Sequence, residues 1–402
     1  MDPLAEIEEL VAHAPRGPGT DAERRTARHL ERRLTDLGRD ARIEPIEVRP
    51  RYELAHLLHA VAGIAGSVLS VSSPLAGTIV LLVTAASAFG DLTGSFRLAR
   101  RLTPRRASQN VLSREDDDRP GVLVLVAHYD AARTGAAFGP RLTERRAALG
   151  NLIRHPIGGF EPFFWSIVAL LVCAALRLPG IHPLPVTIVQ FAATVLLIVS
   201  IPFLADIALS GVVPGANDNA SGVATVLRLA ERYGGDLDSF DVWVLLTGAG
   251  EGLQLGMRAW LRAHRRELDR RRTVFVCVDQ VGLGTVRYAR REGPAIPFSH
   301  HRSLLELCAQ IAEEDADGEG RYGARAYVSR SATDAYPARL AGFPAVSVSC
   351  LGALDYARHH HLPTDTTENV DPAALERAFR FCSELIELID ERIGPQLAPR
   401  SS

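Results

Sequence analysis

Four stretches of the chain are almost entirely apolar and stand out against an otherwise charged sequence. They lie at about residues 55–72, 74–90, 162–176 and 184–205, and none contains a charged side chain. A helix needs about 20 apolar residues to cross a bilayer, so the last stretch is long enough alone and the others need their flanks. The short links SSP and RLPGIHP join the stretches in pairs. The pattern predicts four transmembrane helices in two hairpins.

Arginines beside these stretches indicate their orientation. RLARRLTPRR (97–106) follows the first pair and RLTERR (141–146) precedes the second, whereas the links carry only Arg177. Positive residues accumulate on the cytoplasmic side of membrane helices. We therefore expect a multi-pass protein of the cell (inner) membrane, with everything outside the hairpin tips in the cytoplasm. The alternative is that the stretches are buried helices, or a lid, of a large soluble protein.

The remaining sequence alternates amphipathic helices with apolar strands. We predict helices at 3–13, 20–37, 219–234, 252–267, 302–315 and 371–393, and strands at 41–48, 109–113, 121–130, 239–248, 272–280 and 344–350. Such alternation is typical of an α/β domain whose sheet is covered on both faces. The predicted fold is a three-layer α/β/α sandwich with a mixed, mostly parallel sheet.

The two hairpins interrupt this single domain. We place the domain at residues 1–52, 93–159 and 207–394, the hairpins at 53–92 and 160–206, and a flexible tail at 395–402. The mean hydropathy of +0.05 is then an average over a charged domain and four apolar segments.

Composition excludes several classes of protein. The formal net charge is −2, which argues against a nucleic-acid binder. All 45 basic residues are arginine, so lysine-dependent Schiff-base and P-loop chemistry is absent. The five cysteines are scattered and form no CxxC pair, as expected for reduced thiols in the cytosol. The acidic start MDPLAEIEEL argues against a cleaved signal peptide.

Side chains that can bind metal ions follow the predicted strands. They are His128, Asp130, Asp218, Glu251, Asp279 and His361. In α/β sheets, ligands bind at the carboxyl ends of the strands. Histidines mixed with carboxylates suit zinc or another divalent transition ion. Each residue alone is a weak signal, and Asp218 alone would more often be a helix cap.

The sequence around these residues resembles that of the zinc aminopeptidase family typified by bacterial leucyl aminopeptidase and glutamate carboxypeptidase (metallopeptidase family twenty-eight). The matching segments are VAHYD, GANDNASGVA, GAGEGLQLGM, CVDQVG, TDAYPARLAGFPAV and HLPTDTTENVD. The resemblance covers the whole α/β domain and leaves the hairpins as insertions. It implies hydrolysis of a peptide or small amide by a metal-activated water, without a covalent intermediate.

The resemblance also implies roles for the candidate residues. Two zinc ions would share Asp218, one of them also bound by His128 and Asp279 and the other by Glu251 and His361. Asp130 would orient the imidazole of His128. Of the three consecutive histidines, His361 has the HxxxDT spacing of the family, with Asp365 and Thr366.

One position departs from the family pattern. The family has two adjacent glutamates, a general base and then a ligand, where this chain has Gly250 and Glu251. General-base catalysis contributes about 10²–10⁴-fold. The chain is therefore a hydrolase with another base, such as Asp334 or Glu368, or one in which Glu251 is the base, or a catalytically impaired metal-binding pseudoenzyme that serves as a membrane scaffold. The sequence identifies no protein partner, and no structural advantage of Gly250 is evident from it.

Overall fold

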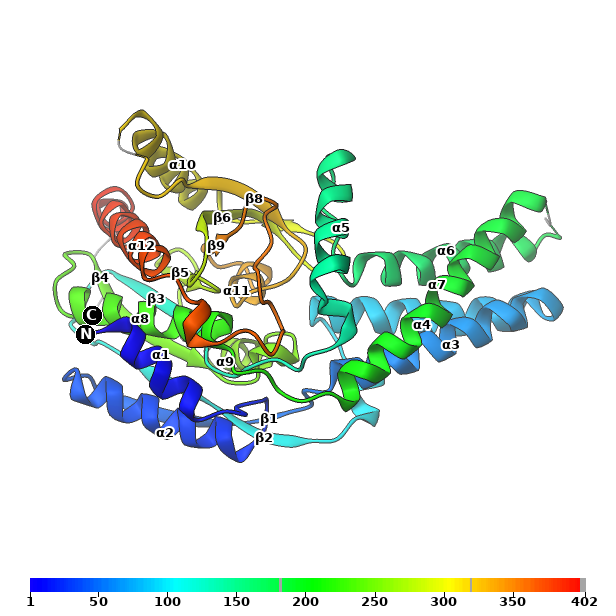
Figure 1. Cartoon of the computed structure of the whole chain (residues 1–402), viewed down its shortest axis with the longest axis horizontal. Coiled ribbons are helices and arrows are strands. Elements are labelled where there is room, and N and C mark those ends of the chain that lie inside the picture. The colour runs from blue at the N-terminus through cyan, green and yellow to red at the C-terminus, as the bar shows by residue number, and fades with distance from the viewer. Residues whose placement is uncertain (181–182, 319, 398–402) are drawn as a thin grey trace.

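Nine strands form one mixed sheet in the computed structural model, which describes residues 1–180, 183–318 and 320–397 (Figure 1). In spatial order they are β1 (Ala41–Val48), β2 (Arg106–Ser113), β4 (Phe240–Thr247), β3 (Gly121–His128), β5 (Thr273–Val278), β9 (Ala345–Leu351), β6 (Thr285–Glu292) and β7 (Phe298–Ser299), with β8 (Arg325–Ser329) beside β6. The four central strands, β4, β3, β5 and β9, are parallel. The flanking pairs β1–β2, β2–β4, β9–β6 and β6–β7 are antiparallel. The mixed sheet was expected, but it is less parallel than predicted: outside the four central strands, the only parallel pair among the described residues is β6–β8.

Helices cover both faces of the sheet, as the three-layer prediction required. One face carries α1 (Pro3–Ala12), α2 (Asp21–Asp36), α8 (Ser221–Tyr233), α10 (Arg302–Asp317) and α12 (Pro372–Arg392), and the other carries α9 (Leu255–His264) and α11 (Ala335–Leu340). Side chains alternate along β3 because successive residues of a strand point to opposite faces. Leu123 and Leu125 join the first core, whereas Val124 and Val126 pack in the second with Trp260 of α9.

Several elements escaped the sequence prediction. They are the strands β6, β7 and β8 and the helices α5 (Pro140–Leu152) and α11. Strand β6 has the sequence TVRYARRE, in which arginines interrupt the alternation of apolar and polar residues that predicts a strand. Arg287 is nevertheless buried, because its Nε donates to Asp355 Oδ1 at 2.7 Å. The helix expected at 252–267 begins only at Leu255, after the short 3₁₀ turn η4 (Gly250–Gly252).

Each hairpin leaves the domain and returns to it at neighbouring points of the backbone. The first lies between β1 and β2, whose ends Val48 and Arg106 are paired. The second is closed by an antiparallel bridge between Arg133 and Val212. The insertions therefore do not interrupt the sheet, because the chain re-enters the domain next to the point at which it leaves.

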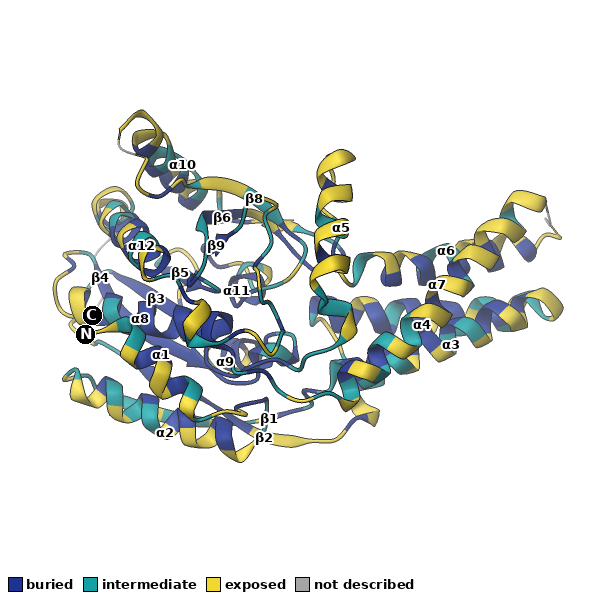
Figure 2. Cartoon of the chain, in the orientation of Figure 1, coloured by how far each residue is buried: buried dark blue, intermediate teal, exposed yellow. Residues whose placement is uncertain are grey.

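The hairpins form a helical arm that projects from one side of the domain (Figure 1). It consists of α3 (Tyr52–Ser72), α4 (Pro74–Thr93), α6 (Glu161–Arg177) and α7 (Leu184–Leu209). Among the described residues, three of these helices, α3, α4 and α7, are long and apolar enough to cross a membrane, whereas α6 has only 17 residues. Many positions along the arm are exposed (Figure 2). Large apolar residues are among them, such as Phe191, which is 71% exposed.

The last part of the chain was expected to be a flexible tail at 395–402. Residues Gly394–Gln396 form the 3₁₀ turn η6, and residues 398–402 lie outside the described residues.

Candidate metal centre

The predicted site residues come together at the carboxyl ends of the parallel strands. His128 is the last residue of β3, and Asp279 follows β5 directly. Glu251 lies in η4, after β4. Asp218 lies in the irregular segment η3 (Ala216–Ala220) that precedes α8, and His361 lies in the loop between β9 and α12. Parallel strands end at one edge of a sheet, so residues far apart in sequence meet there.

His128, Asp218 and Asp279 form one group of possible metal ligands. Each offers an atom within 4.8 Å of the other two, and all three residues are buried. His128 Nε2 lies 3.5 Å from Asp218 Oδ1 and 3.9 Å from Asp279 Oδ1. Asp279 Oδ1 is buried and has no hydrogen-bond partner among the described residues. A buried carboxylate oxygen without a partner is costly unless a cation or a donor compensates it.

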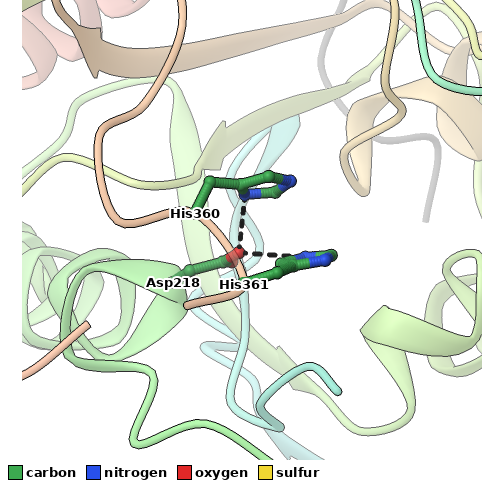
Figure 3. A group of neighbouring side chains, drawn as sticks. All are labelled: Asp218, His360 and His361. Atoms are coloured by element: carbon green, nitrogen blue, oxygen red, sulfur yellow. Dashed lines mark ion pairs between the residues drawn. The ribbon is translucent and has the colours of Figure 1, made fainter. Parts of the chain in front are cut away.

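Asp218 also belongs to a second group, with His360 and His361 (Figure 3). Asp218 Oδ2 lies 3.1 Å from His360 Nδ1 and 3.3 Å from His361 Nε2. Glu251 Oε2 lies 3.2 Å from the same His361 nitrogen. The carboxylate of Asp218 thus lies between the two groups: Oδ1 faces the first group and Oδ2 faces the second.

His360 is a neighbour that the sequence did not assign. It stacks on His361 with ring centroids 3.8 Å apart, and its Nδ1 also lies 3.1 Å from Gln280 Oε1. The preceding His359 is partly exposed, and its Nδ1 lies 2.8 Å from Thr364 Oγ1 instead. Motif spacing singles out one histidine of the three, whereas the bend of the loop lets two of them face Asp218.

Asp130 supports the site at two places. Its Oδ1 lies 3.5 Å from His128 Nδ1, and its backbone oxygen lies 3.2 Å from the same atom. Its carboxylate also accepts hydrogen bonds from the backbone N–H groups of Gly250 (2.7 Å) and Glu251 (3.0 Å). Asp130 therefore connects the imidazole of His128 to the turn that carries Glu251.

The structure provides a reason for glycine at position 250. A Cβ atom there would lie 2.5 Å from His128 Cβ and 2.6 Å from His128 Cγ. Such contacts are shorter than real Cβ atoms make. The backbone of Gly250 therefore packs directly against His128, an advantage that the sequence alone did not reveal.

Three further residues, to which the sequence analysis gave no role, hold the segment that carries Asp218. The backbone N–H groups of Asn217 and Asp218 donate to Asp365 at 2.7 and 3.0 Å, so Asp365, noted only as part of a motif, holds this segment. Arg16 is fully buried, and its Nε donates to Tyr129 O at 2.8 Å while its Nη2 donates to Gly215 O at 2.5 Å. Asn219 ties the segment to β5, with Nδ2 donating to Val278 O at 3.0 Å. An isolated Arg in a loop carries no sequence signal of such a role.

Burial and like charges shift the acidities of the site. Burial together with the carboxylates of Asp218 and Glu251 raises the pKa of Asp279 to about 8. Burial alone would raise the pKa of Asp218, but the neighbouring imidazoles of His128, His360 and His361 keep it well below its ordinary value. The pKa of His361 rises to about 10, since Glu251 and Asp218 outweigh the effect of burial. The site therefore concentrates negative charge, which suits a bound cation.

The two alternative bases lie in different surroundings. Asp334 is buried and accepts a hydrogen bond from Thr247 Oγ1 at 2.7 Å, and Thr247 pairs with His128 across β4 and β3. Its Oδ1 has no hydrogen-bond partner among the described residues. Burial raises the pKa of Asp334 to about 6. Glu368 is exposed in the 3₁₀ turn η5 (Thr367–Asn369).

A pocket opens beside Glu251 at the base of the arm. Its lining includes the turn at Gly17 and Pro18, the start of α3 at Tyr52 and Glu53, and Arg133. The pocket is therefore bounded both by the domain and by the first hairpin.

Comparisons with known proteins agree with the arrangement of these elements. The model of peptidase family M28 matches residues 201–386, a segment that contains Asp218, Glu251, Asp279 and His361. None of the curated proteins compared with the chain matches its sequence.

Solved structures share the fold at low sequence identity. One is a Zn-dependent exopeptidase from Parabacteroides distasonis, with 13% identity, a TM-score of 0.53 and coverage of 97% of each chain. A second is a glutaminyl cyclase from Tannerella forsythia, with 14% identity, a TM-score of 0.54 and coverage of 96% of each chain. A third is an aminopeptidase from Aneurinibacillus, with 12% identity, a TM-score of 0.54 and coverage of 96% of this chain and 92% of the other.

Proposed function

Because this chain belongs to peptidase family M28, we propose that it is a membrane-anchored zinc hydrolase with two metal ions. It removes the N-terminal residue of a peptide, or cleaves a related small amide. The observation that carries the proposal is the position of Asp218, whose carboxylate belongs to both groups of possible ligands. Two-metal hydrolases hold their ions a few Å apart, as one shared carboxylate allows.

The side chains present fit zinc. Imidazole nitrogens and carboxylate oxygens are both common zinc ligands. One ion would be held by His128, Asp218 and Asp279, and the other by Asp218, Glu251 and His361, with His360 beside it. When bound, zinc acts as a Lewis acid that polarises a carbonyl group and makes a water molecule more acidic.

Other residues of the chain orient these ligands. Asp130 faces Nδ1 of His128, which leaves Nε2 directed at Asp218 and Asp279. Asp365 holds the backbone at Asp218 through two N–H groups. Substitution of residues that orient metal ligands in this way typically lowers metal affinity by about 10–100-fold.

The group that accepts a proton from the attacking water must differ from the family pattern, because Gly250 replaces the general-base glutamate and has no side chain. Asp334 is the better supported of the two alternatives, because it lies buried beside Thr247 with an oxygen that lacks a partner. A carboxylate with a pKa of about 6 is ionised at neutral pH and basic enough to accept a proton. Glu251 itself is the remaining candidate.

The arm supports the proposal that this activity lies at a membrane. Its three long helices have exposed apolar side chains and are long enough to cross a bilayer, which would cover these faces. Arginines at its base, in the segment 97–106 and in α5, favour a cytoplasmic position of the domain under the positive-inside rule. A reporter fused to the C-terminus tests this orientation, and a reporter found outside the cytoplasm would refute it.

A metal assay combined with a panel of aminoacyl anilides tests the enzymatic proposal. We expect two zinc ions per chain and turnover that is lost in His128→Ala. His359→Ala is the matched control, because His359 adjoins the site and contacts Thr364 rather than a proposed ligand. Bound zinc without turnover on any substrate would favour the rival function, a non-catalytic membrane scaffold that keeps the metal site.

A further inference from the structure

The turn that carries Glu251 has an unusual backbone. Ala249, Leu253 and Gln254 all have positive φ angles, of 51°, 70° and 53°. Residues with a Cβ rarely adopt this left-handed conformation, and it persists only where the surroundings hold it. The contacts around residues 249–254 show which parts of the protein do so.

Buried carboxylates of the α/β domain hold the N–H groups at the start of this turn. Glu23 Oε1 accepts a hydrogen bond from Ala249 N at 2.8 Å. Asp130 accepts hydrogen bonds from the N–H groups of Gly250 and Glu251. The first half of the turn is therefore fixed by the domain itself.

Two buried arginines hold the carbonyl groups of the second half. Arg100 NH1 donates to Gly252 O at 2.7 Å, and Arg258 Nε donates to Leu253 O at 3.0 Å. Arg100 is 1% exposed and Arg258 is 8% exposed. Hydrogen bonds from a charged donor are about twice as strong as neutral ones.

Both arginines also bind the base of the first hairpin. Arg100 Nε forms an ion pair with Asp91 Oδ1 of α4 at 2.6 Å. Arg258 NH1 donates to Thr93 O, at the end of α4, at 2.6 Å. Gly94 ends α4 with a φ of 73°, and a Cβ there would overlap the guanidinium of Arg258. The guanidinium of Arg258 therefore packs directly against the end of this helix.

We propose that the base of the first hairpin, through Arg100 and Arg258, positions Glu251 in the metal centre. The arm is then part of the site as well as an anchor, because the carbonyls next to Glu251 are bonded to arginines that α4 orients. Arg100 and Arg258 are positioning residues. The inference rests on the proposed function, in which Glu251 is a ligand of the second ion.

Zinc titration of the full-length protein in lipid nanodiscs tests the inference. The wild type is titrated first and is expected to bind two ions. In Arg258→Gln, we expect the ion at His128, Asp218 and Asp279 to keep its affinity and the other ion to bind about 10–100-fold more weakly. Arg262→Gln is the matched control, since Arg262 lies one turn further along α9 and is exposed. It should bind both ions as the wild type does.

Gly94→Ala provides a second variant that alters neither arginine. It displaces the Arg258 guanidinium and should weaken the same ion selectively. Replacing zinc with cobalt gives a spectrum for each site, and only the spectrum of the weaker site should change.

Equal affinities in the folded variants and the wild type would overturn the inference, and so would a parallel loss of both ions, which indicates a general effect on folding. A wild type that binds no zinc would refute the proposed function, and the inference with it.

Discussion

The backbone of Gly250 packs against the side chain of His128 so closely that a Cβ atom at position 250 would lie 2.5 Å from His128 Cβ. The residue that replaces the expected general base is thus in contact with a proposed metal ligand. A side chain at position 250 could enter only if His128 or the turn moved.

Substitution of Gly250 should therefore damage the metal centre. We expect Gly250→Ala to weaken zinc at the His128 position by about 10–100-fold, because the new methyl group displaces the imidazole. Gly250→Glu should give no gain in turnover for the same reason, although the family pattern alone suggests a gain. Competition with a zinc-binding dye measures the affinity. Gly211→Ala is the control, since no atom lies within 4 Å of a Cβ built there. A more active Gly250→Glu variant would show that the turn can move to admit the base.

His361 should contribute more to the second ion than His360 does. His361 Nε2 contacts both Asp218 and Glu251, whereas His360 shares its Nδ1 between Asp218 and Gln280 and is more exposed. We expect His361→Ala to abolish binding of the second zinc ion and His360→Ala to weaken it by about tenfold or less. Isothermal titration of the two variants side by side makes the comparison. The reverse order of effects would mean that His360 is the ligand.

The buried carboxyl group of Asp334 should make stability depend on pH. Burial raises its pKa from 3.8 to about 6, so the folded protein binds a proton that the unfolded chain releases between these values. This contribution to stability is complete below pH 4 and is lost as the pH rises through 6. In metal-free protein, Asp334→Asn should therefore raise the free energy of unfolding more at pH 8 than at pH 4, by about 3 kcal/mol at most.

Denaturant unfolding at the two pH values measures this difference. Glu368→Gln, which changes an exposed carboxylate, serves as the control. An equal effect of Asp334→Asn at both pH values would contradict the assignment. The same variant reports on catalysis, because loss of turnover with zinc still bound is expected if Asp334 accepts the proton.

A charge on the outer face of α7 should prevent stable insertion into a membrane. Ile198 lies near the middle of this helix and is 49% exposed. An aspartate at the centre of a membrane helix costs about 2.5–3.5 kcal/mol. We expect Ile198→Asp to shift the protein from the carbonate-resistant membrane fraction to the soluble or aggregated fraction, while Ile198→Leu remains in the membrane. An unchanged distribution would argue for a soluble protein whose arm covers another surface.

Sequence pattern predicted the elements with strong periodicity and missed those with weak periodicity. The apolar run in β3 and the amphipathic pattern of α12 needed no tertiary information. Strand β6 was missed because buried Arg287 breaks the pattern and is stabilised by Asp355, which is 68 residues away in sequence. The start of α9 was placed too early, since its first turn depends on the positive φ angles of Leu253 and Gln254.

The sequence by itself predicted the α/β architecture, the two apolar hairpins and most of the candidate metal ligands, because periodicity, apolar run length and strand-end position are local properties. Only the tertiary structure decided which atoms meet: that Asp218 stands between two groups of ligands, that His360 joins His361, and that Gly250 packs against His128. It also showed that Arg100 and Arg258 join the arm to the turn that carries Glu251. The physical reason is that these contacts join segments far apart in the chain, and their geometry depends on how sheet, turn and hairpin pack.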